Sequence, residues 1–221
     1  MKEVDEDCGF CGELNNLDCE NNLFEKLVRP NSGLITRIIL KTENFAVMPT
    51  IGAFIEGYLL IVSKHHYNCI GQMPLSIIDE LDFLTKKVKK LIWTHYHKSA
   101  VCFEHGGISC SNKFGGCIDH AHLHVVPCSS AENFIQTIEK YQMNIQHIET
   151  IRELNSYAKE ELPYLYWEDI DQQKYLINAD VVPSQFFRQI IASRYGVIGQ
   201  WDWRQHYFID NMEKTVRKLT Q

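Results

Sequence analysis

The 221-residue sequence lacks any apolar run close to the roughly 20 residues that a membrane-spanning helix needs, so we expect no membrane association. Its start, MKEVDEDCGFCG, is acidic and has no apolar stretch, unlike a secretory signal. Basic residues are fewer than acidic ones, 22 against 28, so the formal net charge is −6. The chain therefore has no overall basic character for nonspecific nucleic-acid binding, although local patches remain possible. We expect a soluble, cytoplasmic protein.

Internal repeats, low-complexity segments and an obvious flexible linker are absent as well. With 45% hydrophobic residues, a chain of this length can bury a core without disulfide support. Its eight cysteines, without a signal peptide, favour reduced thiols or a metal site over a disulfide framework. We divide the chain into a first domain, residues 1–130, and a C-terminal α/β extension, residues 131–221, that packs on it.

The sequence pattern predicts an α+β fold with one long helix. Apolar residues at helical spacing predict that helix after Pro74, through LSIIDELDFLTKKVKKLIWTHYHK. Runs of β-forming residues predict strands at 34–42, 45–50, a third strand ending at Lys64, SAVCFEHG, the stretch closed by Pro127, and a YLYWED/KYLINA hairpin. Further helices are predicted in SSAENFIQTIEKY, in VPSQFFRQIIASRYG and from about Arg204 to Leu219, whereas the first thirty residues are predicted to form loops.

Three histidines alternate with apolar residues in IDHAHLHVVPCSS. On a strand, His120, His122 and His124 share one face, about 6–7 Å apart along the chain, and the residues between them face the core. This spacing suits an extended ligand such as a polyphosphate better than a single metal ion. Neutral imidazole is abundant at pH 7 and can attack an electrophile through one nitrogen. The central histidine has a neighbour on each side and is the predicted nucleophile.

A glycine pair stands directly before this stretch, in GGCID. At Gly115 and Gly116 the backbone can approach a ligand closely and offer N–H groups to phosphate. Two glycines alone more often indicate only a turn, so this interpretation depends on the neighbouring histidines.

HAHLHVV is similar to the signature of the histidine triad family, His-apolar-His-apolar-His-apolar-apolar. The order of elements over 34–128 and the segment GYLLIVSKHHY also resemble that family, with Tyr58 and Ser63 in place of the usual His and Pro. The resemblance implies a histidine-triad α+β fold and a nucleotide hydrolase or transferase, with dinucleoside polyphosphates as the favoured substrates. It implies attack by His122 on the α-phosphorus, a nucleotidyl-histidine intermediate, and phosphate held by His124.

The same resemblance implies that main-chain N–H groups near Gly116 and Cys117 stabilise the transition state. Here Gly116 and Cys117 replace a usual Gln-Ser, and Glu104 or His105 stands near a usual Asn, so contacts to the leaving group and ribose differ. EHGG can place Glu104 or His105 at the pocket, and we predict Glu104 as a substrate-binding residue, although EHGG also fits an ordinary strand end. The motifs PSQFFR and WDWR resemble the C-terminal part of CwfJ-type splicing-associated proteins, which leaves RNA as a possible partner.

CGFC, a Cys-x-x-Cys at Cys8 and Cys11, supplies two of the four ligands of a tetrahedral zinc site. A thioredoxin-like role does not fit, since no βαβ pattern surrounds it, but unbound surface thiols remain an alternative. Some histidine triad proteins and galactose phosphate uridylyltransferases bind zinc through such a motif. That resemblance implies a structural zinc held by Cys8, Cys11, His66 and His120, with His65 as an alternative to His66.

Arg188 lies on a predicted amphipathic helix and is predicted to bind substrate phosphate if the extension covers the site, although helix arginines usually face solvent. Small members of the family form dimers, and the extension can replace that contact, so both a monomer and a homodimer are expected. A non-catalytic nucleotide- or RNA-binding module is the alternative function, and a purely metal-binding regulatory protein is a third.

Overall fold

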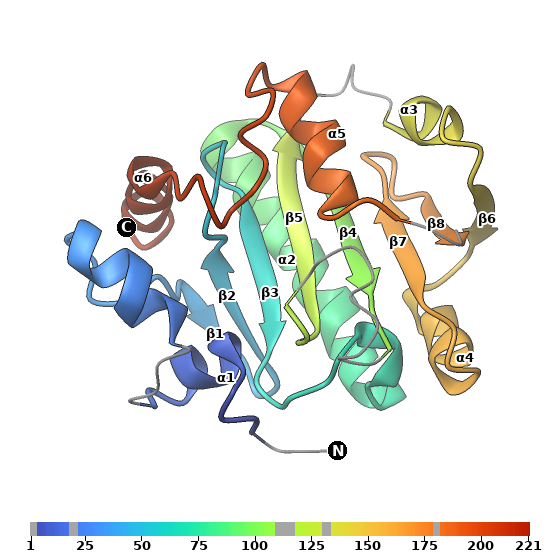
Figure 1. Ribbon diagram of the computed structural model, residues 1–221, viewed down its shortest axis with the longest axis horizontal. Helices are drawn as coiled ribbons and strands as arrows, with labels where there is room; N and C mark the ends of the chain where they lie inside the picture. Colours follow the sequence, from blue (N-terminus) through green and yellow to red (C-terminus); the bar gives the residue numbers. More distant parts are fainter. Residues whose placement is uncertain (1–3, 18–21, 109–117, 130–133, 179–181) are drawn as a thin grey trace.

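The computed structural model describes residues 4–17, 22–108, 118–129, 134–178 and 182–221. The described strands form one eight-stranded sheet in the order β1-β2-β3-β5-β4-β7-β8-β6, in which every neighbouring pair is antiparallel (Figure 1). The strands are β1 (Leu40–Lys41), β2 (Phe45–Pro49), β3 (Leu59–Ser63), β4 (Ser99–Gly106), β5 (His122–Cys128), β6 (Asn144–Ile148), β7 (Tyr164–Glu168) and β8 (Lys174–Asn178). The mixed helical and antiparallel architecture confirms the predicted α+β class.

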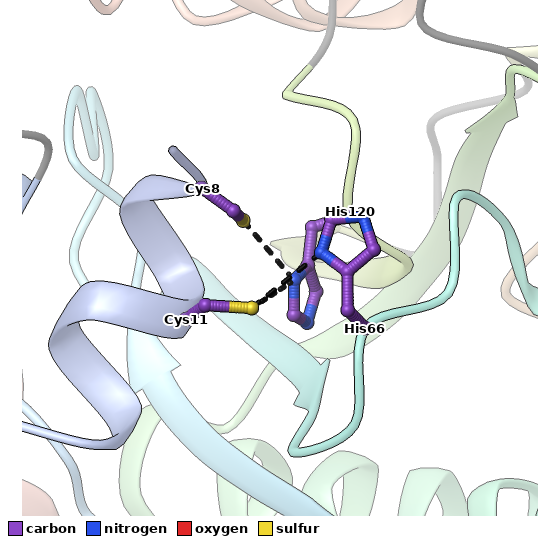
Figure 2. A group of neighbouring side chains, drawn as sticks. All are labelled: Cys8, Cys11, His66 and His120. Carbon is purple, nitrogen blue, oxygen red and sulfur yellow. Dashed lines mark hydrogen bonds between the residues drawn. The ribbon is translucent and has the colours of Figure 1, made fainter. Parts of the chain in front are cut away.

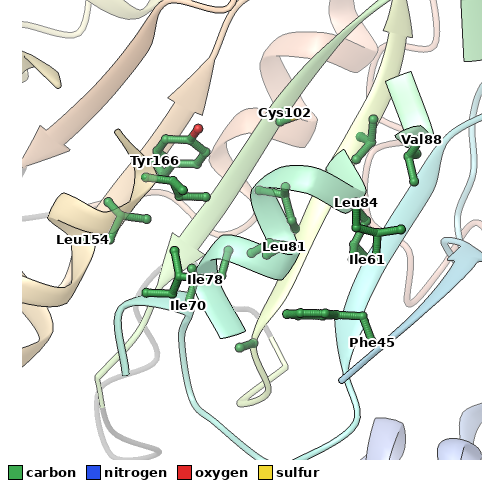
Figure 3. Close-up of a cluster of buried hydrophobic side chains, with 14 of the residues drawn as sticks. Phe45, Ile61, Ile70, Ile78, Leu81, Leu84, Val88, Cys102, Leu154 and Tyr166 are labelled. Atoms are coloured by element: carbon green, nitrogen blue, oxygen red, sulfur yellow. The ribbon is translucent and has the colours of Figure 1, made fainter. Parts of the chain in front are cut away.

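The long helix α2 (Leu75–Tyr96) covers one face of the sheet. Its buried residues Ile78, Leu81, Leu84 and Val88 pack on the side chains that β3, β4 and β5 direct to that face, among them Ile61 and Cys102 (Figure 3). Leu123 and Val125 of β5 join this cluster, as the alternation of the triad stretch predicts.

The C-terminal extension continues the sheet. β7 pairs with β4, with Cys102 opposite Glu168, so the hairpin β7–β8 and the strand β6 become part of the same layer. α5 (Phe186–Arg194) packs on the face opposite α2, where Phe187 and Ile191 lie in a cluster with Phe103 and Trp167 (Figure 1). Both faces of the sheet are thus covered, and α5 lies on the face that carries the triad.

The C-terminus and the helical turns that precede β1 lie at the β1–β2 side of the sheet (Figure 1). Met212 of α6 (Ile209–Leu219) packs with Phe24, Val28 and Ile51 in a small buried cluster. The remaining helices are α1 (Gly9–Leu14), α3 (Ile135–Glu139) and α4 (Leu154–Lys159), with short helical turns at Phe24–Val28, Arg29–Asn31, Ile70–Gln72 and Ile151–Glu153.

Several boundaries differ from the sequence predictions. The triad strand begins at His122, so His120 lies in the turn before it, and the last helix begins at Ile209 rather than near Arg204. α1 forms where a loop was predicted, and β6 and α4 were not predicted at all. Among the described residues, no helix has the length and apolar character needed to cross a membrane.

Candidate functional site

Four side chains from three separate segments meet at the N-terminal end of the triad strand β5. The ligand atoms of Cys8, Cys11, His66 and His120 all lie within 4.8 Å of one another (Figure 2). Cys8 directly precedes α1 and Cys11 lies in its first turn, so the helix brings both thiols to one side. His66 follows β3 and His120 precedes β5, so the antiparallel pairing of these strands brings the two imidazoles together.

The distances in this cluster fit a tetrahedral zinc site. Cys8 Sγ lies 3.3 Å and Cys11 Sγ 3.6 Å from His120 Nδ1, and Cys11 Sγ lies 3.5 Å from His66 Nδ1. A tetrahedron with Zn–S arms of about 2.3 Å and Zn–N arms of about 2.0–2.1 Å has S···N edges of about 3.5 Å. Two thiols and two imidazoles form a donor set typical of structural zinc, with no open position for water.

A hydrogen bond from Nε2 of the His120 ring leaves the other ring nitrogen, Nδ1, available as a metal ligand. Its Nε2 lies 2.7 Å from the Ser63 carbonyl oxygen, which can only accept, so Nε2 carries the proton and the Nδ1 lone pair faces the thiols. Burial lowers the pKa of His120 to about 3, which keeps the ring neutral, and raises the pKa of the Cys8 thiol to about 12. A bound cation would be needed to hold that thiol as a thiolate at neutral pH. His65 is exposed and outside the cluster, so His66 is the histidine in position to bind.

The next histidine along the strand presents a free lone pair. His122 Nδ1 lies 2.6 Å from the His120 carbonyl oxygen, so Nδ1–H donates and Nε2 is unprotonated in the neutral ring. The Phe10 ring from α1 packs against the imidazole with 5.3 Å between ring centroids. His122 is therefore held by the main chain of the same residue whose side chain belongs to the metal cluster.

His124 is fixed on two sides. Its ring stacks on Phe103 of β4 with 4.2 Å between centroids and an interplanar angle of 11°. Its Nδ1 is hydrogen-bonded to the Tyr58 hydroxyl at 2.8 Å, and Tyr58 is the residue that replaces the family's usual His. Burial lowers the pKa of His122 to about 4 and that of His124 well below its ordinary value, so both rings are neutral at pH 7.

His122 and His124 open into a pocket of about 480 Å³, its mouth included. One part of its wall is polar and contains the two triad histidines, His105 and the guanidinium groups of Arg37 and Arg188. The other part is mainly apolar and draws on both ends of the chain: the remaining lining residues are Phe10, Leu23, Thr50, Ile51, Leu60, Ile118, Gln185 and Trp203. The extension thus contributes three lining residues, Gln185, Arg188 and Trp203.

Of the two arginines in the pocket, one is ion-paired with a carboxylate and the other is not. Arg37 forms a bidentate ion pair with Glu13, at 2.6 and 2.8 Å. Arg188 is 2% exposed and donates only to the carbonyl oxygens of Gly52 and Trp201, and no carboxylate among the described residues pairs with it. A buried cation without an anion is costly, so the pocket is suited to an anionic ligand.

Glu104 does not reach this pocket, which corrects its prediction as a substrate-binding residue. It points to the α2 face, where its carboxyl group accepts hydrogen bonds from Ile70 N–H at 2.7 Å and the Tyr164 hydroxyl at 2.6 Å. The strand residue that reaches the pocket is its neighbour His105, since successive side chains alternate between faces. Gly115, Gly116 and Cys117 lie outside the described residues, so their predicted roles stay predictions.

No protein-family model matches the chain, and no curated protein matches it. Among solved structures, the chain is similar to a HIT-like protein involved in cell-cycle regulation from Bartonella henselae, at 11% identity over 72% of this chain and 96% of that one, with a TM-score of 0.44. It is similar to a hypothetical histidine triad nucleotide-binding protein from Sulfolobus tokodaii, at 17% identity over 70% and 88% of the two chains, with a TM-score of 0.42.

A zinc-bound histidine triad family protein from Mycobacterium smegmatis is also similar, at 16% identity over 63% of this chain and 91% of that one, with a TM-score of 0.38. These solved structures are histidine triad proteins, the family that the sequence resembles. This similarity concerns the fold and assigns no role to an individual residue.

Proposed function

We propose that the protein is a histidine triad enzyme that cleaves or transfers at a nucleoside α-phosphate, with His122 as the nucleophile and dinucleoside polyphosphates as favoured substrates. The observation that carries this proposal is the unprotonated Nε2 of His122 in a pocket whose buried guanidinium, Arg188, has no carboxylate partner among the described residues. A neutral nucleophile beside an uncompensated positive charge is suited to attack on an anionic phosphoryl group.

In the proposed reaction, the Nε2 lone pair of His122 forms a bond to phosphorus while the bond from phosphorus to the leaving oxygen breaks. The bonding electron pair departs with that oxygen. Water or another hydroxyl group then attacks the same phosphorus, its proton passes to solvent, and the N–P electron pair returns to Nε2. Throughout, Nδ1–H keeps its bond to the His120 carbonyl, which holds the ring at a fixed angle.

His124 is the proposed donor to the non-bridging phosphate oxygens. If the Tyr58 hydroxyl donates to His124 Nδ1, Nε2 carries the proton and can donate into the pocket. Stacking on Phe103 holds this donor rigidly, which lowers the cost of orienting it during the reaction.

Zinc is the proposed occupant of the Cys8–Cys11–His66–His120 cluster. When bound, it would supply structural cross-linking rather than a reactive water, because all four positions would be taken by protein ligands. The cluster joins α1 to the turn before β5, and the His120 carbonyl of that turn orients His122. A metal at one end of the row would therefore stabilise the nucleophile at the next position.

The test is chemical trapping. We expect brief mixing of the protein with a diadenosine polyphosphate, followed by denaturation at alkaline pH, to leave adenylate on His122, identified by mass spectrometry of peptides. Nucleotide binding without turnover and without such an adduct would instead support the non-catalytic binding module. The possible RNA partner, the cytoplasmic location and the choice between monomer and homodimer stay predictions.

A further inference from the structure

Four buried side-chain polar atoms have no hydrogen-bond partner among the described residues, namely Tyr96 Oη, His105 Nδ1, Trp167 Nε1 and Arg188 Nη1. Two of them, on His105 and Arg188, belong to residues that line the triad pocket. A buried donor without an acceptor is destabilising, and native proteins rarely keep one without a reason. Two in one pocket indicate a ligand with acceptor oxygens.

His105 is held as a neutral donor. Its Nε2 accepts the Phe187 backbone N–H at 3.5 Å, so the proton of the neutral ring lies on Nδ1, the atom that lacks a partner. The ring packs against Phe187 and Phe103, with centroids 5.2 and 5.6 Å away, and lies 6.4 Å from the His124 ring. Phe187 belongs to α5, so the extension determines which nitrogen of His105 can donate.

Arg188 is fixed by its other two donor positions. Nε donates to the Trp201 carbonyl at 2.9 Å and Nη2 to the Gly52 carbonyl at 2.7 Å, which leaves Nη1 unpaired. The guanidinium carbon lies 5.3 Å from the ring centroids of both Phe54 and Tyr58. The side chain cannot swing into solvent without breaking these contacts, so the charge is preset at the pocket.

Together with His124, His105 and Arg188 offer more hydrogen-bond donors than the non-bridging oxygens of one α-phosphoryl group need. A nucleoside α-phosphoryl group has two non-bridging oxygens, and His124, one strand position from His122 on the same face, is already placed to meet one of them. We infer that His105 and Arg188 form a second anion subsite for the phosphate that leaves, so that the substrate class is phosphoanhydrides rather than phosphoramidates. This inference rests on the proposed function.

In such a reaction the P–O bond to the leaving phosphate breaks as the bond from phosphorus to His122 Nε2 forms. The electron pair of the broken bond stays on the departing oxygen, where negative charge accumulates. Arg188 supplies a positive charge and His105 an N–H donor beside that oxygen. An amine leaving group would leave after gaining a proton and would draw no benefit from a cation there.

A binding measurement tests the subsite without turnover. In a His122→Ala background, we expect ADP to bind at least tenfold more tightly than AMP by calorimetry, because only ADP carries a second phosphate. His105→Phe keeps an aromatic ring without a donor and should remove most of this preference. His105→Asn, whose amide nitrogen can stand near the Nδ1 position, should retain it. Equal affinities of AMP and ADP before the second substitution would overturn the inference.

Kinetics give an independent readout. We expect His105→Phe to lower kcat/KM for diadenosine triphosphate by about tenfold or more, the effect of losing one hydrogen bond to a charged group, and for adenosine 5′-phosphoramidate by less than twofold. Arg188→Met should act in the same direction, with Arg194→Met, an exposed position of the same helix, as the control. An equal loss for both substrates would assign these residues to the shared α-phosphate instead.

The two proposals fail differently. If the protein turns over neither substrate but binds ADP more tightly than AMP through His105, the second subsite stands and the proposed enzymatic function is wrong. If both substrates are cleaved through His122 and the His105 and Arg188 variants show no preference between them, the enzyme stands and the second subsite is wrong.

Discussion

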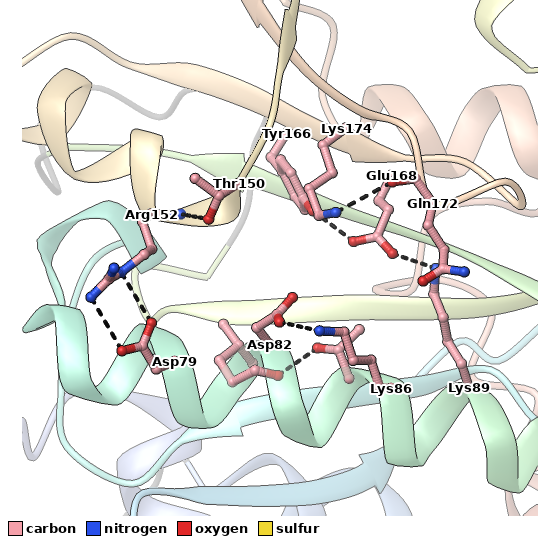
Figure 4. A network of polar contacts seen from close by, with 12 residues as sticks. Asp79, Asp82, Lys86, Lys89, Thr150, Arg152, Tyr166, Glu168, Gln172 and Lys174 are labelled. Atoms are coloured by element: carbon pink, nitrogen blue, oxygen red, sulfur yellow. Dashed lines mark hydrogen bonds and ion pairs between the residues drawn. The ribbon is translucent and has the colours of Figure 1, made fainter.

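The buried carboxyl groups on the α2 face of the sheet and the buried donors of the triad pocket differ in whether the described residues pair them. On the α2 face, Glu104 accepts hydrogen bonds from Ile70 and Tyr164. Glu168 accepts hydrogen bonds from Lys89 and Tyr166 (Figure 4). On the triad face, His105 and Arg188 keep donors that no described residue satisfies. Buried polar groups that serve only the fold are normally paired, so the two unpaired donors of the pocket are the ones arranged for a ligand.

The same contrast recurs along the triad face itself. At one end, His120 is fully engaged, with Nε2 donating to Ser63 and Nδ1 among the thiols. At the next position, Nδ1 of His122 donates to the His120 carbonyl, and no hydrogen bond to a described residue occupies Nε2. The row of histidines therefore has a closed, structural end at His120 and an open, reactive end at His122 and His124.

The largest effect is expected from His122→Ala, which removes the free nitrogen of the reactive end. We expect activity toward nucleotide substrates to fall by about 10³-fold or more, because the covalent step is lost. Zinc content and Tm should stay near those of the unsubstituted protein, since His122 is outside the metal cluster. His120→Ala is the matched control at the closed end and should lose zinc. Turnover retained in His122→Ala would end the proposed mechanism.

The second effect concerns the closed end. Cys11→Ser should reduce bound zinc from about one equivalent to a small fraction, because serine is a poor ligand for this ion. If free zinc is about 1,000 times its Kd, losing it costs about 4 kcal/mol of stability, which for a chain of this size lowers Tm by about 10 °C. Metal analysis and calorimetry measure both quantities.

A matched variant separates metal loss from general damage to a buried cysteine. Cys69 is equally buried but lies outside the cluster, so Cys69→Ala should retain zinc. Activity should fall in Cys11→Ser as well, since the metal holds the turn whose carbonyl orients His122. Full activity in a zinc-free Cys11→Ser protein would separate the metal from the nucleophile.

The arrangement of His122 and His124 can be predicted from the sequence because it depends only on neighbouring residues in one strand. The period of two places His122 and His124 on one face and Leu123 and Val125 on the other, whatever surrounds the strand. The prediction that Cys8 and Cys11 share a metal site with His120 comes from a ligand arrangement known in similar proteins, not from a local sequence pattern. In the structure, the ligand atoms of Cys8, Cys11, His66 and His120 lie within 4.8 Å of one another.

The remaining features depend on contacts between distant segments. SAVCFEHG is apolar on both faces, with Ala100 and Cys102 on one and Val101 and Phe103 on the other, so its alternation does not tell whether Glu104 or His105 shares the triad face. Exposed side chains dominate β6, and α1 is only six residues long, so neither carries a clear periodicity. Arg188 reaches the pocket only because β7 pairs with β4 and returns α5 to that face.

On the α2 face, the buried carboxyl of Glu104 should make stability depend on pH. Burial raises the pKa of Glu104 to about 8 from an ordinary value of 4.5. The folded protein then holds a proton that the unfolded chain releases between these values, so the contribution of Glu104 to stability is fully present below about pH 4.5 and is lost as pH rises to about 8. Between pH 5 and 7.5 this group should cost about 3 kcal/mol.

Glu104→Gln removes the titration and retains an acceptor for the Ile70 N–H. The difference in unfolding free energy between the variant and the unsubstituted protein, measured by urea denaturation across this range, isolates the contribution of the one carboxyl. The expected difference changes in favour of the variant as pH rises. A difference that is constant with pH would mean that Glu104 is ionised in the folded protein throughout.

The smallest effect is expected from the ion pair that joins α2 to the extension. Lys89 Nζ lies 2.6 Å from Glu168 Oε1, with side chains that are only 16% and 8% exposed (Figure 4). Lys89→Met leaves Glu168 with the Tyr166 hydroxyl alone, and we expect a cost of about 2 kcal/mol, below that of a fully buried pair because water still reaches the lysine.

Lys86→Met breaks an exposed pair with Asp82 on the same helix and should cost about 0.5 kcal/mol or less. Equal costs would show that Glu168 keeps a partner without Lys89, and the ion pair would then add nothing to the pairing of this carboxylate. Activity and zinc content should be unchanged in both variants, because a loss of pairing on this face leaves the triad face intact.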